Sequence, residues 1–177
     1  MKYYILLLFA CMSLTANAQL FSTRNGFVGF YSETPFENIV AENNQVYAIL
    51  DISKKTIAFS MLMKSFVFQK ELMQVHFNED YIESDKFPKA NFTGSFTEII
   101  DPLKNGTIIL HITGSMMMHG ITKPFSTNAT LIIKNNTLDG KSNFKINPSD
   151  FNIEIPSLVR KKIAQQIDVK IKVSLHP

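Results

Sequence analysis

Apolar and polar residues alternate with a period of two over much of this chain. The clearest case lies near the C-terminus, where apolar residues occupy every second position from Ile167 to Leu175 and polar residues occupy the positions between them. Successive side chains of a β-strand point to opposite faces of the sheet. The pattern therefore predicts a strand with one buried face and one solvated face.

The same period recurs in seven further segments. Turn-forming pairs such as Asp101-Pro102, Asn105-Gly106 and Asp139-Gly140 separate them. Eight strands at this spacing favour an antiparallel β-sandwich or β-barrel. The seven other predicted strands cover residues 26–32, 45–51, 56–67, 91–100, 108–118, 125–133 and 140–146.

Two segments depart from the strand period. Within residues 69–84, Leu72, Met73, His76 and Phe77 follow the spacing of one helical face. Asn78 is a candidate N-cap for a second short turn there. Residues 156–166, just before the last strand, are interpreted as a short helix or a helical turn. The chain is therefore expected to be mainly β with one or two short helices.

The first eighteen residues have the features of a secretory signal peptide. Lys2 supplies a positive start, a short apolar run follows, and Ala16-Asn17-Ala18 forms a cleavage motif. The apolar run is much shorter than the ~20 residues that a membrane anchor needs. Lipoprotein processing at Cys11 is the other alternative. We expect residues 1–18 to be removed on export, which leaves residues 19–177 as a single domain.

Composition and charge exclude several functions. The chain has 18 Lys and Arg against 15 Asp and Glu, which is too weak a basic excess to favour a nucleic-acid binder. Residues 19–177 contain no hydrophobic run long enough to span a membrane and no cysteine. The exported chain is therefore expected to lack disulfides and thiol chemistry, and to be stabilised by its core.

The histidines show no metal-ligand spacing. His111, His119 and His176 are interpreted as residues on the polar faces of strands, and His76 as a residue that forms a hydrogen bond within a helix. We therefore expect no metal site and no cofactor other than a bound lipid. An enzyme that acts on a lipid through His76 or His119 remains a third hypothesis after the two given below.

Catalytic motifs are also missing from the sequence. It contains no Gly-x-Ser-x-Gly elbow, no Walker loop and no Gly-x-Gly-x-x-Gly motif. Carboxylates cluster at Glu79, Asp80, Glu83 and Asp85, where a solvated connection is a better interpretation than an acid–base pair. The chain is therefore not expected to be an enzyme.

Phenylalanine and methionine dominate the apolar residues in the middle of the chain. They include Phe59, Met61, Phe66, Phe68 and Met73, and the chain contains 15 Phe and 8 Met in all. Methionine side chains are flexible and polarisable, and they can line an adaptable cavity. A closed barrel of about eight strands either fills its interior with side chains or holds one ligand. Periodicity alone leaves both options open.

Two segments resemble the YceI-like family. Residues 84–92 (Ser-Asp-Lys-Phe-Pro-Lys-Ala-Asn-Phe) follow a helical connection and enter a strand, and residues 114–123 (Gly-Ser-Met-Met-Met-His-Gly-Ile-Thr-Lys) form a later turn motif. His119-Gly120 in this motif is expected to form a turn, in which Gly120 adopts a positive φ. The resemblance extends from about residue 26 to residue 175.

This resemblance implies an extended, eight-stranded, lipocalin-like antiparallel β-barrel with an interior tunnel. Members of the family are similar in binding a long amphiphile, such as a polyisoprenoid or an isoprenoid quinone, and in being exported by bacteria. We therefore expect a periplasmic or secreted protein. The aromatic residue and the early histidine that are common near the family's first strand are missing from residues 26–50. That departure leaves the ligand open among a quinone, another isoprenoid and a shorter lipid.

The leading hypothesis is a binding protein that transports or stores an amphiphilic lipid. The alternative is a cell-envelope adaptor that binds an unidentified protein through the outside of its barrel. For the leading hypothesis, Leu72, Met73 and Phe77 are expected to close one end of the cavity. The complete set of predicted lipid-binding residues is Phe59, Met61, Phe66, Phe68, Leu72, Met73, Phe77, Phe92, Leu110, Ile112, Met116, Met118, Leu131 and Ile171.

Overall fold

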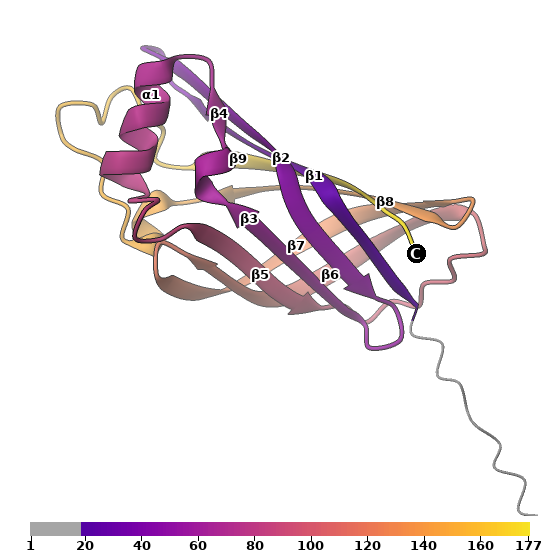
Figure 1. The fold of residues 1–177 in the computed structure, drawn as a ribbon. Helices are drawn as coiled ribbons and strands as arrows, with labels where there is room; N and C mark the ends of the chain where they lie inside the picture. The colour runs from indigo at the N-terminus through magenta and orange to yellow at the C-terminus, as the bar shows by residue number, and fades with distance from the viewer. Residues whose placement is uncertain (1–18) are drawn as a thin grey trace, which may run out of the picture.

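The computed structural model describes residues 19–177 (Figure 1). The predicted signal peptide and the alternative processing site at Cys11 lie outside these residues. The strands are β1 (Leu20–Glu33), β2 (Asn38–Asp51), β3 (Thr56–Leu62), β4 (Val67–Phe68), β5 (Lys89–Ser95), β6 (Gly106–Met118), β7 (Ile121–Lys134), β8 (Thr137–Ile146) and β9 (Ile167–Leu175).

Eight of these strands form a closed antiparallel barrel. Their order is β1-β9-β8-β7-β6-β5-β3-β2, and a direct pairing between β1 and β2 closes the ring. Phe30 of β1 illustrates the closure, because it lies opposite Ala41 of β2 and also opposite Val169 of β9. The short strand β4 pairs with β2 outside the ring. The predicted mainly β, eight-stranded barrel is confirmed.

The strand alternation places apolar side chains inside the barrel. In β9, Ile167, Val169, Val173 and Leu175 are buried, and the lysines between them are exposed. Buried residues form two clusters along the barrel. One contains Leu110 and Leu138, and the other contains Met63 and Phe151 and lies toward α1 (Glu71–His76). Figure 1 shows α1 at one end of the barrel and the β5–β6 connection at the other.

The predicted strand over residues 56–67 is interrupted. β3 ends at Leu62, and a 3₁₀ turn, Met63–Ser65, follows it. Met63 and Phe66 are both buried, three positions apart, which matches the period of a 3₁₀ turn and not that of a strand. The predicted strand over residues 91–100 likewise ends at Ser95.

The predicted helix within residues 69–84 is present but shorter. α1 is followed directly by a π-helical turn, Phe77–Tyr81. Asn78 does not act as an N-cap. Its Nδ2 atom instead donates a hydrogen bond back to the carbonyl oxygen of Gln74. The side chain therefore follows the preceding helical turn and does not start a new one.

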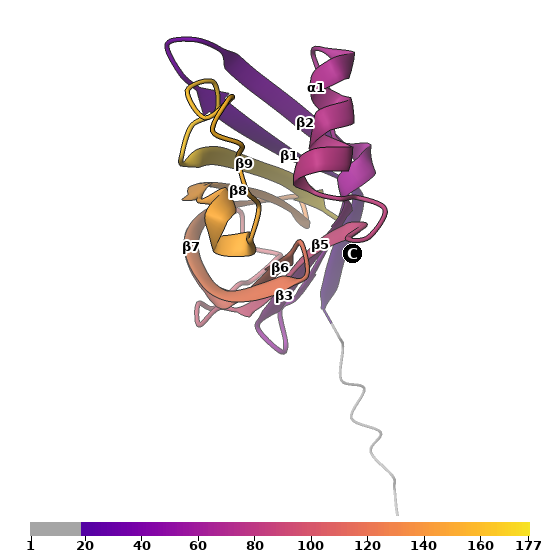
Figure 2. The same cartoon turned by 90° about the vertical axis from the view of Figure 1, so that its left-hand side faces the viewer.

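Of the two alternatives predicted for residues 156–166, a short helix or a helical turn, the structure shows turns and no helix. The backbone N–H of Val159 donates to Pro156, and that of Lys162 donates to Val159, so the segment consists of turns with i to i+3 hydrogen bonds. A short helix depends on packing an apolar face. Leu158 is exposed here, so the apolar face that packs is limited to Val159 and Ile163, which line the cavity. A 3₁₀ turn, Pro148–Phe151, precedes this segment and lies across the barrel end in Figure 2.

Candidate functional site

The barrel encloses a cavity of about 560 Å³. All nine strands contribute lining residues, as do α1 and residues 153–163. Its volume falls within the roughly 300–1,000 Å³ that ligand pockets usually have. The structure thus resolves the question that periodicity left open, because the barrel contains both packed core clusters and an unfilled space.

The structure places all fourteen predicted lipid-binding residues against this cavity. They come from β3, β4, β5, β6, β7, β9, α1 and the turns next to them. Leu110, Ile112 and Leu131 belong to the densely packed cluster away from α1. Phe59, Met61 and Met116 pack partly buried against the cluster near α1. Their role in binding a lipid remains a prediction.

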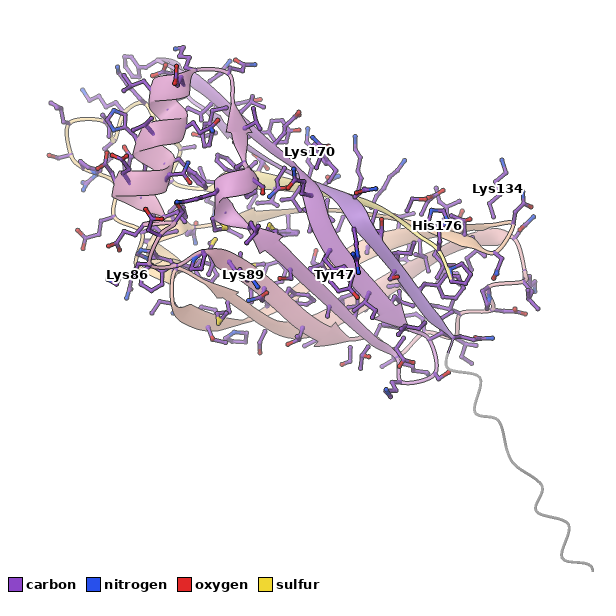
Figure 3. The ribbon with its side chains drawn as sticks, in the orientation of Figure 1. Tyr47, Lys86, Lys89, Lys134, Lys170 and His176 are labelled. Carbon is purple, nitrogen blue, oxygen red and sulfur yellow. The ribbon has the colours of Figure 1, made fainter. Side chains whose placement is uncertain are left out.

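Phenylalanine rings form much of the cavity wall near α1. Phe30 lies 5.3 Å from Phe66 and 5.5 Å from Phe68, measured between ring centroids. Phe77 lies 4.9 Å from Phe68. These distances are typical of favourable aromatic packing. Figure 3 shows the sulfur atoms gathered below α1, so aromatic and thioether groups share this part of the interior.

A second aromatic group lies farther round the barrel. The ring centroid of Phe125 is 4.7 Å from that of Phe144 and 6.1 Å from that of Phe92. The residues predicted from the sequence include Phe92 but not Phe125 or Phe144. The alternation of β7 and β8 places both residues on the inner face, so the pattern contained the signal that could have found them.

The cavity opens to solvent at the α1 end. Lys70, Leu72 and Lys162 are exposed and also line the cavity, so the space between them connects the interior with solvent. The β1–β2 turn, the start of α1 and residues 156–166 contribute lining residues at this mouth, and the three segments lie at the same end of the molecule in Figure 2. The sequence did not predict that residues 156–166 line the cavity, since Val159 and Ile163 follow no strand period.

Charged side chains connect the three segments of the mouth. The Nζ atom of Lys70 lies 2.7 Å from Oε1 of Glu37, and that of Lys162 lies 4.0 Å from Oε2 of Glu37. The hydrogen bond from Lys70 lowers the pKa of Glu37 below its ordinary value. Ser32, which is buried, accepts a hydrogen bond of 2.8 Å from the backbone N–H of Ala164. This bond attaches residues 156–166 to β1.

The outside of the barrel differs in character from its interior. Lys170 lies on the outer face of β9, where its Nζ atom is 4.3 Å from the ring centroid of Tyr31. Lys86 and Lys89 lie at the connection below α1, and Lys170 lies away from them along the barrel (Figure 3). These lysines lie outside the barrel, whereas the cavity is lined mainly by apolar side chains, with a few polar residues such as Asn91, Thr127, Lys141 and Ser142.

Two histidines form exposed pairs with carboxylates. The Nδ1 atom of His76 lies 2.6 Å from Oδ2 of Asp80, as expected for a hydrogen bond within the helical segment. The Nδ1 atom of His111 lies 2.5 Å from Oε1 of Glu98. This contact lowers the pKa of Glu98 to about 2. Within residues 19–177, neither of these histidines forms a hydrogen bond with a serine or threonine hydroxyl.

His119 does not lie on the polar face of a strand. It occupies the β6–β7 turn with a φ of 51°, followed by Gly120 with a φ of 73°. The predicted turn is therefore confirmed. The side chain is only 10% exposed, and it contacts the backbone oxygen of Phe151 and the carboxylate of Glu83.

The clustered carboxylates face different partners. Asp80 pairs with His76, Glu83 with His119 and Lys86, and Asp85 with Lys64. Within residues 19–177, no three His, Cys, Asp or Glu side chains are grouped so that they could hold a metal ion. The helices in this range are also all too short to cross a membrane.

Comparison with known proteins supports the same fold. A family model for the YceI-like domain matches residues 21–175. No curated protein matches the chain in sequence. The chain is similar to a polyisoprenoid binding domain from Saccharophagus degradans implicated in plant cell wall breakdown, with a TM-score of 0.77 and 11% identity, over 90% of this chain and 98% of that domain.

Two further solved structures share the barrel. BcnA from Burkholderia cenocepacia has a TM-score of 0.71 and 14% identity, over 86% of this chain and 96% of that protein. The YCEI protein of Campylobacter jejuni has a TM-score of 0.59 and 17% identity, over 76% of this chain and 82% of that protein. At these identities the likeness concerns the fold alone. The family model, however, spans nearly all the described residues, and the chain belongs to the YceI-like domain family.

Proposed function

We propose that this chain binds an amphiphilic lipid, a polyisoprenoid or an isoprenoid quinone, inside its barrel and transports or stores it. One observation carries the proposal: a cavity of about 560 Å³ is lined by apolar side chains from every strand and is open at one end. Most of the groups that converge on this space are phenyl rings, thioethers and branched alkyl groups. Their arrangement favours binding over catalysis.

Burial of an apolar chain would supply the affinity. Each methylene moved from water to an apolar site contributes roughly 0.8 kcal/mol, so one five-carbon isoprene unit contributes about 4 kcal/mol before the cost of ordering. A few such units therefore suffice for stable binding. The flexible methionines, including Met61 and Met116, let the wall adapt to methyl branches along the chain.

The charges at the mouth define the orientation of the ligand. Lys70, Lys162 and Glu37, with His76 of α1, are ionisable groups that line the cavity at the end where it opens. Placing a polar headgroup beside them leaves it hydrated, and the apolar tail then lies against Phe68, Phe77 and the deeper residues. The reverse orientation would bury the headgroup among apolar side chains at a large cost.

The relationship to known proteins supports this class of ligand. The similar domain from Saccharophagus degradans is described as a polyisoprenoid binding domain. A water-soluble carrier is useful where a lipid must cross an aqueous compartment. We therefore propose that the chain acts after export, in the periplasm or outside the cell, in agreement with its signal-like N-terminal residues.

Native mass spectrometry tests this function. The protein is purified without detergent, its intact mass is measured, and the bound material is extracted with organic solvent and identified. A lipid with a long apolar tail, released on denaturation, is the expected result. Protein that carries no lipid and takes up neither a polyisoprenol nor a quinone from solution would refute the proposal.

The envelope-adaptor interpretation makes a different prediction. An adaptor that uses the barrel exterior would keep its protein partner when an arginine blocks the cavity at Met116. A lipid carrier would instead lose its ligand. Pull-down from envelope extracts, in parallel with lipid extraction from the same variant, separates the two.

A further inference from the structure

Three large apolar side chains stand exposed around the mouth of the cavity. They are Phe36 in the β1–β2 turn, Leu72 in the first turn of α1 and Leu158 in residues 156–166, which are 68%, 65% and 92% exposed. We call these three residues the mouth rim. Each neighbours residues that line the cavity, namely Glu37, Met73 and Val159. The rim is therefore continuous with the opening.

Local contacts hold the rim segments in place. The Thr34 hydroxyl oxygen accepts hydrogen bonds from the backbone N–H groups of Phe36 and Glu37, which fixes the tip of the β1–β2 hairpin. Lys70 connects α1 to this tip through Glu37, and Ala164 connects residues 156–166 to Ser32 of β1. Phe36, Leu72 and Leu158 thus project from anchored backbone, so their exposure is a property of the fold.

Positive charge accompanies Leu158. Residues 156–166 contain Arg160, Lys161 and Lys162 and no carboxylate. Lys162 approaches Glu37, whereas Arg160 and Lys161 form no ion pair within residues 19–177. Exposed carboxylates such as Glu33, Glu71 and Glu154 lie on other segments of the chain. This segment therefore presents one exposed leucine beside two exposed cations.

A lipid surface with anionic headgroups matches this arrangement. Apolar side chains such as Phe and Leu bury in the boundary between headgroups and acyl chains, and neighbouring Lys and Arg contact anionic headgroups. We infer that the mouth rim docks on an anionic lipid surface, with Leu158, Arg160 and Lys161 as its main contacts. This inference rests on the proposed function, because docking there faces the open end of the cavity toward the membrane from which a lipid would enter.

Vesicle flotation tests the inference with a matched pair of variants. Leu158→Asp adds a charge at the mouth rim. Leu103→Asp adds the same charge at the opposite end of the barrel, in the β5–β6 connection, where Leu103 is 82% exposed. Both side chains are outside the core, so both variants should unfold at the temperature of the wild type. The probes are vesicles of phosphatidylcholine alone and of phosphatidylcholine mixed equally with phosphatidylglycerol.

The wild type and Leu103→Asp are expected to bind the mixed vesicles, and Leu158→Asp is expected to bind them many times more weakly. Each Lys or Arg near an anionic surface raises binding roughly five-fold, so Arg160→Ala with Lys161→Ala should lower partitioning about 25-fold. Equal losses in Leu158→Asp and Leu103→Asp would overturn the inference. Wild-type protein that does not bind the mixed vesicles would also overturn it. So would rim variants that still bind the vesicles but no longer bind an envelope protein.

The lipid content of the same preparations separates this inference from the proposed function. Wild-type protein that carries lipid but fails to bind vesicles would refute the docking surface and leave the carrier function standing. Wild-type protein that binds vesicles through the mouth rim but carries no lipid would refute the carrier function and support the docking surface.

Discussion

His119 connects the β6–β7 turn to the backbone of Phe151, with its Nδ1 atom 2.9 Å from the carbonyl oxygen. A carbonyl oxygen only accepts hydrogen bonds, so Nδ1 is the donor. On the other side of the ring, Nε2 lies 3.0 Å from Oε2 of Glu83. The ring centroid of Phe87 lies 4.5 Å away. One side chain thus holds together two connections at the α1 end of the barrel.

Replacement of His119 by alanine is expected to destabilise the protein. The carbonyl of Phe151, a buried residue, loses its donor, which costs about 1–3 kcal/mol of unfolding free energy. The positive φ adds backbone strain for alanine, so His119→Asn, which tolerates that conformation better, should lose less. Urea unfolding measures the unfolding free energy of both variants.

His176→Ala is the matched control for this prediction. His176 is exposed and lies near the other end of the barrel (Figure 3). We expect it to change the unfolding free energy by less than about 0.5 kcal/mol. Similar losses in His119→Ala and His176→Ala would show that the contact with Phe151 contributes nothing.

Leu110→Ala should test the packed cluster away from α1. Leu110 is only 1% exposed, and its truncation is expected to cost about 2–5 kcal/mol of unfolding free energy. Ile109→Ala, on the outer face of the same strand, should cost much less because Ile109 is exposed. Denaturant midpoints of the two variants check this. Equal midpoints would contradict the assigned inner and outer faces of β6.

Met116→Arg should separate ligand binding from stability. Met116 lines the cavity, so a charged side chain there is expected to lower lipid occupancy more than it lowers the melting temperature. Met117→Arg places the same charge at the next position, where the side chain is exposed, and should leave both quantities near wild type. Lipid extraction and thermal unfolding measure the two effects. If Met116→Arg lowered them in equal measure, Met116 would be an ordinary core residue.

Gly114→Ala tests the closest approach of β5 and β6. A Cβ atom at this position would lie 2.5 Å from Cα of Gly94 and 2.9 Å from the ring of Phe92, and it would clash with the backbone oxygen of Thr93. The strands would have to separate, at a cost of roughly 1–3 kcal/mol. Gly106→Ala in the same strand meets no atom within 4 Å and is the control. If urea unfolding showed that both variants were as stable as the wild type, the close packing of β5 and β6 at Gly114 would be refuted.

Glu98 should make stability depend on pH in the acid range. The contact with His111 lowers its pKa from 4.5 to about 2, so the unfolded chain takes up this proton at a higher pH than the folded one. The stabilising contribution of Glu98 is therefore complete above about pH 4.5 and disappears as the pH falls toward about 2. Glu98→Gln and His111→Ala should each reduce this acid dependence. If the difference in unfolding free energy between wild type and the variants did not change with pH across this range, the contact between Glu98 and His111 would not contribute to stability.

The two-residue period of the strands predicted an antiparallel sandwich or barrel, and the resemblance to the YceI-like family then implied the barrel. That period depends only on local geometry, so the alternation by itself assigns Leu110, Ile112 and Met116 to one face of β6. The inner-face residues Phe125 and Phe144 were equally visible in the pattern, although the prediction did not include them. The predicted departure from the strand period at residues 69–84 also follows from local spacing, which is that of a helical face, and this segment contains α1.

Only the tertiary structure decided where the barrel is hollow and where it opens. Leu110 and Phe68 both line the cavity, yet Leu110 belongs to the packed cluster away from α1 and Phe68 packs against the cluster near α1. That difference arises from how distant strands pair, with β4 on β2 and β6 between β5 and β7, which no local period encodes. The mouth itself joins Glu37, Lys70 and Lys162, and it is held by a hydrogen bond between Ser32 and Ala164. Contacts between residues so distant in sequence exist only after the barrel has closed.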